Sequence, residues 1–197
     1  LLFKERTVYI TCMSSWFNER KSAQIAAFFC EKEGGSIPVL KLVKLIYLSD
    51  RESMRQTGFP ITNDELVSMP HGPVNSMTLN FIDGNSESER WSDLITDKAN
   101  YMVGLTRKRA DNDVDELSEL DVDVLEAVWK QFGSMTKYAI RDWTHANCPE
   151  WEDPRGSCNP IPHERILKYL GVEAADELAA EIAEDRFVDS VFSSLRA

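Results

Sequence analysis

The sequence contains no uninterrupted apolar run of the roughly 18 residues that a membrane-spanning helix needs. Basic residues are also in the minority, because 22 Lys and Arg stand against 33 Asp and Glu, and the formal net charge is −11. Nucleic-acid phosphates are bound chiefly by Lys and Arg, so this balance argues against a nucleic-acid backbone as the main partner. It favours a protein that stays in solution and meets basic partners.

Signatures of the common enzyme classes are missing as well. The chain has no glycine-rich phosphate loop and no G-x-S-x-G around a nucleophilic serine. Cys30 or Cys148 could be paired with His71 or His145 as nucleophile and base, but almost any chain offers such pairs. The carboxylates of residues 111–126 lie in a polar run, which is typical of a solvated surface. We therefore expect no enzyme and no cofactor.

Cysteine is scarce, and no C-x2-C pair of zinc ligands occurs among Cys12, Cys30, Cys148 and Cys158. One group of residues nevertheless has the side chains that zinc prefers, namely His145, Cys148, Cys158 and His163. Their spacing matches no zinc finger or ribbon. We expect free thiols in a reducing cytoplasm and no metal, and we keep a zinc site formed by these four residues as an alternative.

What the sequence does have is helical periodicity. The stretch VLKLVKLIYLSDRESMR is apolar on most sides, which predicts a buried central helix over about residues 38–56. Ser36 as N-cap and Pro38 in the first turn would begin it. Lys44, Arg51 and Arg55 form a basic stripe that could face an acidic partner, but we expect it to face the chain's own acidic residues 111–126. Ser118 and Asp121 predict a capping box at the start of a further helix.

Short extended pieces surround this helix. β-forming residues and turns predict a small β-hairpin or short strands over about residues 60–72 and 91–107. The stretch Met-Pro-His-Gly-Pro-Val at 69–74 reads as a rigid turn, with Pro73 leading into a helix over 75–83. We expect His71 to be structural and to hydrogen-bond Asp50. The predicted fold is mainly α, a single-domain helical bundle around the central helix.

The two ends of the chain differ from this body. Residues 1–12 precede Met13 and are interpreted as an upstream or non-native extension of a domain that covers 13–170. Residues 171–197 predict an acidic amphipathic helix that either packs on the domain or docks a partner. Its expected apolar stripe consists of Leu178, Ile182, Phe187, Val191 and Leu195.

Short motifs follow one another in a distinctive order. A helix with the pattern K-x2-K-L-I-Y-L-x-D (41–50) precedes G-x-P-I (58–61) and then G-P-V (72–74). Further along, a helix that follows Leu117-Ser118 reaches Trp129, and a Thr-His pair (144–145) is followed by Pro-x-Trp (149–151). Over about residues 21–170 this order resembles the Panacea domain, the SocA-like antitoxin family that is also described as phage-associated and GepA-like. The family-motif or structural residues are Lys41, Lys44, Tyr47, Asp50, Gly58, Pro60, His71, Gly72, Pro73, Trp129, His145 and Trp151.

The resemblance implies a function in a bacterium or phage. It implies the antitoxin of a two-gene toxin–antitoxin system, and we expect this antitoxin to neutralise a cognate toxin by direct binding in the cytoplasm. The alternatives are a phage-related regulatory or interaction protein, such as a protease adaptor or a transcriptional regulator, and then a zinc-binding protein or hydrolase. We expect a toxin as partner, with a protease as a further candidate, no membrane and no nucleic acid. The partner-binding surface is not given by the motifs, and a homo-oligomer remains open.

Overall fold

The computed structural model describes residues 16–86 and 88–195. The predicted extension over residues 1–12 therefore lies outside the described residues. Among the described residues no helix is both long and apolar enough to cross a membrane.

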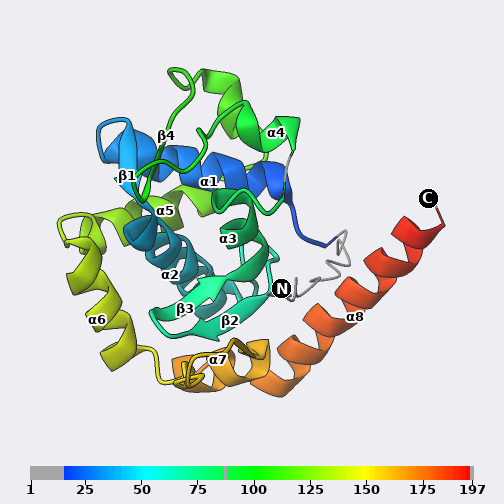
Figure 1. Cartoon of the computed structure of the whole chain (residues 1–197). Coiled ribbons are helices and arrows are strands. Elements are labelled where there is room, and N and C mark those ends of the chain that lie inside the picture. Colours follow the sequence, from blue (N-terminus) through cyan, green and yellow to red (C-terminus); the bar gives the residue numbers. More distant parts are fainter. Residues whose placement is uncertain (1–15, 87, 196–197) are drawn as a thin grey trace, which may run out of the picture.

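The described chain is mainly helical with two small sheets, which confirms the predicted class (Figure 1). Its α-helices are α1 Glu19–Lys32, α2 Val39–Thr57, α3 Ser76–Ile82, α4 Glu89–Ser92, α5 Glu119–Phe132, α6 Lys137–Asn147, α7 His163–Leu170 and α8 Ala175–Ser194, and a 3₁₀ turn η1 spans Asp111–Val114. The strands are β1 Ser36–Pro38, β2 Leu66–Met69, β3 Gly72–Asn75, β4 Met102–Gly104 and β5 Asn159–Pro160.

Helix α2 packs against α1, α5, α6, α7 and β3. Its side chains are buried on every side of the axis, and Leu42, Leu45, Ile46 and Tyr47 are fully covered. The predicted start of this helix is wrong in one respect. Ser36 is not an N-cap, because residues 36–38 form β1 and pair with β4 in the register Ser36↔Gly104. The helix ends at Gly58, whose φ of 87° and N–H bond to the Met54 carbonyl form a left-handed C-cap.

The second sheet has the strand order β3-β2-β5. Strands β2 and β3 form a tight hairpin in which Met69 pairs with Gly72, so the predicted turn is present. Pro73, however, does not lead into a helix. It lies in β3 opposite Ser68, and α3 begins only at Ser76. Because β3 is an edge strand, the N–H that proline lacks is not needed by a further strand.

The predicted β element over residues 91–107 contains β4, whose ladder partner is the distant β1. Isolated bridges Ile95↔Leu105 and Ala99↔Met102 also fold this segment back on itself. The turn between them brings Lys98 and Tyr101 to the start of α2, where the Val39 N–H donates to the Tyr101 carbonyl at 2.9 Å.

The predicted partner of the acidic residues 111–126 is wrong. These carboxylates pair chiefly with α1, through Arg20–Asp115, Lys21–Asp121 and Lys32–Glu126. The expected basic stripe of α2 does not form one surface, because Lys44 is buried, Arg51 pairs with Glu150 and Arg55 pairs with Glu52 of its own helix. The capping box of Ser118 and Asp121 at the start of α5 is present.

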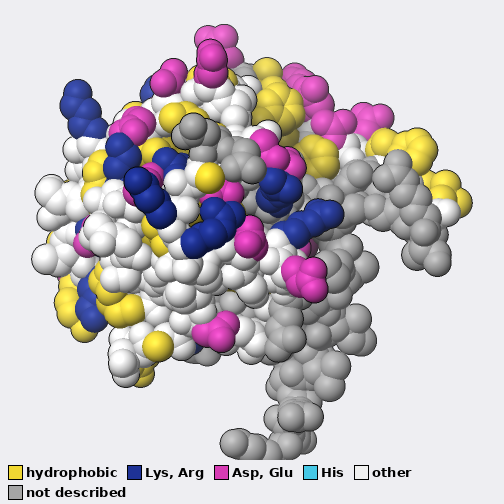
Figure 2. Space-filling view, turned by 90° about the horizontal axis from the view of Figure 1, so that it is seen from above, with side chains coloured by type: hydrophobic (Ala, Val, Ile, Leu, Met, Phe, Trp, Pro, Cys, Tyr) yellow, Lys and Arg dark blue, Asp and Glu magenta, His cyan; other side chains and the backbone are white. Residues whose placement is uncertain are grey.

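Helix α8 packs on the body by its first half and then projects away from it (Figure 1). Ala175 and Ile182 are buried, and Leu178 lies against Gly58 at the end of α2. The predicted single apolar stripe is wrong, since Leu178 and Ile182 face the body while Phe187 and Leu195 are 68% and 76% exposed. In Figure 2 hydrophobic side chains gather at the tip of this projecting helix, on the right.

Candidate functional site

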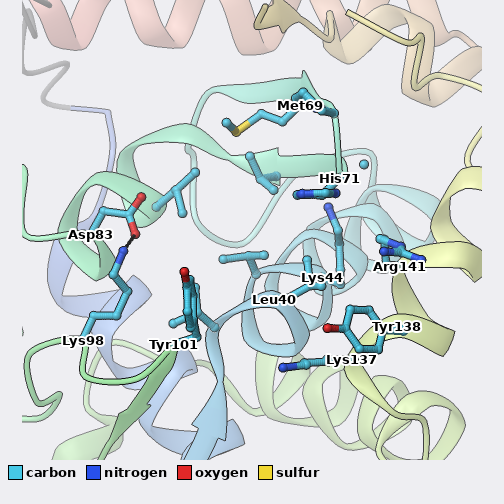
Figure 3. Close-up of a pocket in the computed structure, with 16 residues that line it drawn as sticks. Leu40, Lys44, Met69, His71, Asp83, Lys98, Tyr101, Lys137, Tyr138 and Arg141 are labelled. Atoms are coloured by element: carbon cyan, nitrogen blue, oxygen red, sulfur yellow. Dashed lines mark hydrogen bonds and ion pairs between the residues drawn. The ribbon is translucent and has the colours of Figure 1, made fainter. Parts of the chain in front are cut away.

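A cleft of about 580 Å³ opens where the start of α2 meets the β2–β3 turn and the first turns of α6 (Figure 3). The turn before β4 and the end of α3 close its other side. The largest group of lining side chains is apolar and consists of Val39, Leu40, Val43, Met69, Pro70, Val74 and Leu79. Tyr101 and Tyr138 stand at its rim and are 79% and 55% exposed.

The charges that line the cleft are mostly positive. Four cations, Lys44, Lys98, Lys137 and Arg141, line it together with a single acid, Asp83. Lys98 is paired with Asp83 at 2.5 Å, drawn as a dashed line in Figure 3. Arg141 pairs with Asp142, which is not part of the lining. Basic side chains thus outnumber acidic ones in the lining of the cleft, although the net charge of the chain is −11.

Lys44 is the least expected of these cations, because its side chain is fully buried. Its Nζ donates a hydrogen bond to the Pro73 carbonyl at 2.7 Å, which ties α2 to β3. Burial, together with the smaller effect of the Arg141 charge, lowers the pKa of Lys44 to about 7. Among the described residues no carboxylate forms an ion pair with Lys44. Sequence reasoning placed this lysine on a basic surface because helical spacing shows which residues share a face, not what covers it.

Gly72 explains why the turn can lie so close to Lys44. Its φ is +96°, and a Cβ at this position would stand 2.9 Å from Lys44 Nζ and 3.0 Å from Thr144 Oγ1. A side chain would therefore be both strained and obstructed. The Gly-Pro-Val motif is a close contact between the hairpin, α2 and α6.

The two predicted aromatic motif residues His145 and Trp151 support the same hairpin. Their rings stack with centroids 4.3 Å apart, and Trp151 Nε1 donates to the Met69 carbonyl at 2.9 Å. Burial lowers the pKa of His145, as does the charge of Lys44 nearby. His71 stands exposed at the rim of the cleft, above Lys44 in Figure 3.

The predicted hydrogen bond between His71 and Asp50 is wrong. Asp50 is fully buried and accepts bonds from the Ile61 and Thr62 N–H groups, the Thr62 hydroxyl and the Asn75 amide. Burial raises the pKa of Asp50, while these hydrogen bonds oppose the rise. Asp50 therefore anchors the segment after Gly58 and Pro60 to α2, beneath the hairpin.

A second buried acid, Asp64, anchors the start of α3 in the same way. Its carboxylate accepts the N–H groups of Met77 and Thr78 and the Thr78 hydroxyl at 2.7–2.8 Å. These are N–H groups of the first turn, which a helix itself leaves without partners. Sequence reasoning missed Asp64, because an Asn-Asp pair in a loop is also an ordinary turn signal.

A third acid with no exposed surface is Glu150, which sequence reasoning also missed. It is fully buried and accepts bonds from the Tyr47 hydroxyl at 2.6 Å and from Arg51 Nε at 2.7 Å. Burial and the neighbouring Glu150 charge raise the pKa of Tyr47. The sequence does show an acid directly before the motif residue Trp151. The role of that acid could not be predicted from the sequence, because it depends on the return of the loop after α6 to α2.

Lys41 and Trp129 form another contact of motif residues. Lys41 Nζ donates to Glu33 and to the Gly133 carbonyl at 2.8 Å and lies 5.2 Å from the centre of a Trp129 ring. This cation–π contact joins the end of α1, α2 and the end of α5.

The alternative zinc site is not formed. No group of three or more metal-ligating side chains converges in the part of the chain that the structure describes. Cys148 is buried beneath α2, Cys158 is exposed in the loop before β5, and His145 is stacked on Trp151. Burial raises the pKa values of Cys30 and Cys148 to about 12, so neither thiol is a ready nucleophile.

Comparison with curated proteins and with solved structures gave no match. A family model described as "Antitoxin SocA-like, Panacea domain" matches residues 42–152, which is more than half of the chain. The matched region runs from α2 through the β2–β3 hairpin to the loop after α6, and so includes Lys44, Asp50, Gly72 and Glu150. The chain therefore belongs to the SocA-like antitoxin family that is defined by the Panacea domain.

Proposed function

We propose that this chain is the antitoxin of a two-gene toxin–antitoxin system and that it neutralises its cognate toxin by direct protein–protein binding in the cytoplasm. The observation that carries the proposal is its membership of the SocA-like antitoxin family. Neutralisation by binding requires a complementary surface and no reaction, so the proposal assigns no catalytic residue.

The charge of the chain supports a particular kind of toxin. A net charge of −11 attracts a basic protein over a distance and accelerates the encounter. Toxins that act on RNA or nucleotides carry basic surfaces because their substrates are anionic. We therefore expect a basic toxin.

Co-expression tests the proposal. Each neighbouring gene is induced alone and together with this chain. We expect one neighbour to arrest growth alone, growth to be restored by co-expression, and the two proteins to purify as a complex. A variant with the buried Leu45 replaced, Leu45→Asp, is the unfolded control. If no neighbouring product arrests growth, or if the arrest persists with this chain present, the proposal is wrong.

The cleft favours a second candidate, a protease adaptor. Its apolar lining and its excess of cations suit an apolar protein segment that carries a carboxylate. An adaptor would hold such a segment of a protease there while the toxin is bound elsewhere. The toxin's lifetime separates the two functions. Direct neutralisation leaves the toxin abundant during co-expression, whereas an adaptor shortens the half-life of the toxin. If the chain is an adaptor, Leu40→Asp in the cleft should restore the long half-life of the toxin.

A further inference from the structure

The two halves of α8 present their apolar side chains in different directions. In the first half, Ala175, Leu178 and Ile182 face the body. Just past the middle of the helix, the Arg186 guanidinium lies 3.6 Å from the Glu65 carboxylate. In the second half of α8 and at the residue that follows it, the exposed apolar side chains are Phe187, Val188, Val191, Phe192 and Leu195. We call Phe187, Val188, Phe192 and Leu195 the outward surface. The exposed fraction of Phe187 is 68%, and that of Leu195 is 76%.

Helical geometry places the outward surface away from the protein's own core. At about 100° per residue, its centre lies about 115° around the axis from the side that carries Leu178 and Ile182. A straight α8 cannot bring both sides onto the body. The outward surface is therefore not an extension of the core, and an acidic, polar helix end would have served solubility better.

The same side of the helix is acidic nearer the body. Glu177, Glu181 and Glu184 fall within the arc of the outward surface and are exposed. Within the described residues, none of these three carboxylates forms an ion pair. One side of α8 thus presents, over about 27 Å, unpaired acids followed by large apolar side chains.

This arrangement suits a partner that has a basic rim beside an apolar groove. The α8 helix of a second copy of this chain does not offer such a groove. Parallel pairing of two α8 helices would oppose like charges. Antiparallel pairing of the apolar ends alone would bury less than the roughly 1,000 Å² that a stable interface needs. Antiparallel pairing over the whole length would set acids against apolar side chains.

We propose that the outward surface of α8, with the three glutamates beside it, is where the toxin docks, and that the toxin receives it as a helix in an apolar groove with a basic rim. The inference rests on the proposed function, and it names the surface that performs it. The glutamates steer and orient the toxin, and the phenylalanines fill the groove.

The full chain is tested against the purified neighbouring-gene toxin by calorimetry and by rescue of growth. Phe187→Gln with Phe192→Gln is expected to lower the affinity at least about 30-fold and to abolish rescue. Tyr169→Gln is the matched control, because Tyr169 on α7 has the same 56% exposure as Phe192 but lies off this surface. Circular dichroism checks that α8 is retained.

Charge is tested separately. Glu181→Lys with Glu184→Lys should slow association at least about tenfold, whereas Asp97→Lys with Asp123→Lys changes the net charge equally at exposed positions elsewhere and should have a smaller effect.

The outcomes separate this inference from the function. If the wild-type chain rescues and the phenylalanine variant rescues and binds like Tyr169→Gln, the docking surface is elsewhere while the antitoxin function stands. If the wild-type chain neither rescues nor binds, both are wrong. If sedimentation shows a wild-type dimer that the phenylalanine variant abolishes, the surface joins two copies and the inference is overturned.

Discussion

At the scale of single residues, the cleft depends on a glycine that no other residue can replace without cost. Gly72 combines a left-handed backbone with a position against Lys44 and Thr144. Other glycines of the chain share the first property but not the second. Gly34, for example, has a φ of +92° with nothing within 4 Å of its missing Cβ.

This difference makes a prediction that isolates packing from backbone strain. Gly72→Ala should lower the free energy of unfolding by about 3 kcal/mol, since left-handed strain and overpacking add. Gly34→Ala introduces backbone strain without overpacking and should lower the free energy of unfolding by about 1 kcal/mol. Urea denaturation measures both. Equal losses would show that the hairpin moves aside freely.

Lys44 makes stability depend on pH. Its pKa is about 7 in the folded protein and 10.5 when unperturbed. Between these values the unfolded chain binds a proton that the folded protein lacks, so stability rises with pH through this window.

We expect the stability of the wild type relative to Lys44→Met to increase by about 1 kcal/mol per pH unit above neutrality. Denaturation of both proteins at a series of alkaline pH values measures it, and the other titrating groups cancel in the difference. A difference that does not change with pH would show that Lys44 titrates normally.

At the scale of elements, buried acids hold loops and the start of a helix in place. Asp50 holds the segment after α2, Asp64 holds the start of α3, and Glu150 holds the loop after α6. Each acid joins residues far apart in the chain, so the hairpin that frames the cleft is fixed from below and from one side.

The Glu150 contact can be compared with an exposed pair on the same helix. Glu150→Gln leaves Arg51 without its buried counter-charge and should cost about 3 kcal/mol. Glu52→Gln removes the partner of the more exposed Arg55 and should cost less than about 1 kcal/mol. Thermal and urea unfolding compare them, and a cost for Glu150→Gln as small as for Glu52→Gln would contradict a structural role for the buried pair.

At the scale of the whole molecule, charge is divided unevenly. The chain is acidic overall, the charged residues that line the cleft are mostly cations, and the outward side of α8 joins acids to exposed apolar side chains. These two surfaces belong to different parts of the fold, as Figure 1 shows for α8 and for the hairpin beside α6.

Binding to a basic toxin should therefore depend on salt. Because exposed charges are screened beyond about 8 Å at physiological ionic strength, the association rate should fall several-fold between low and physiological salt while the dissociation rate changes little. Stopped-flow measurements at several salt concentrations test this. An association rate that does not depend on salt would show that charge does not steer the toxin to this chain.

The sequence by itself determined the helical class, α2 nearly to its ends, the turn at residues 69–74 and the family, because periodicity, capping residues and motif order are local signals. It did not determine that Ser36 belongs to a strand, that Lys44 is buried, or that Glu150 meets Tyr47. Only the tertiary structure decided these, because each depends on a segment distant in the chain. The same is true of the cleft and of α8, where spacing showed apolar residues but packing decided which of them the body covers.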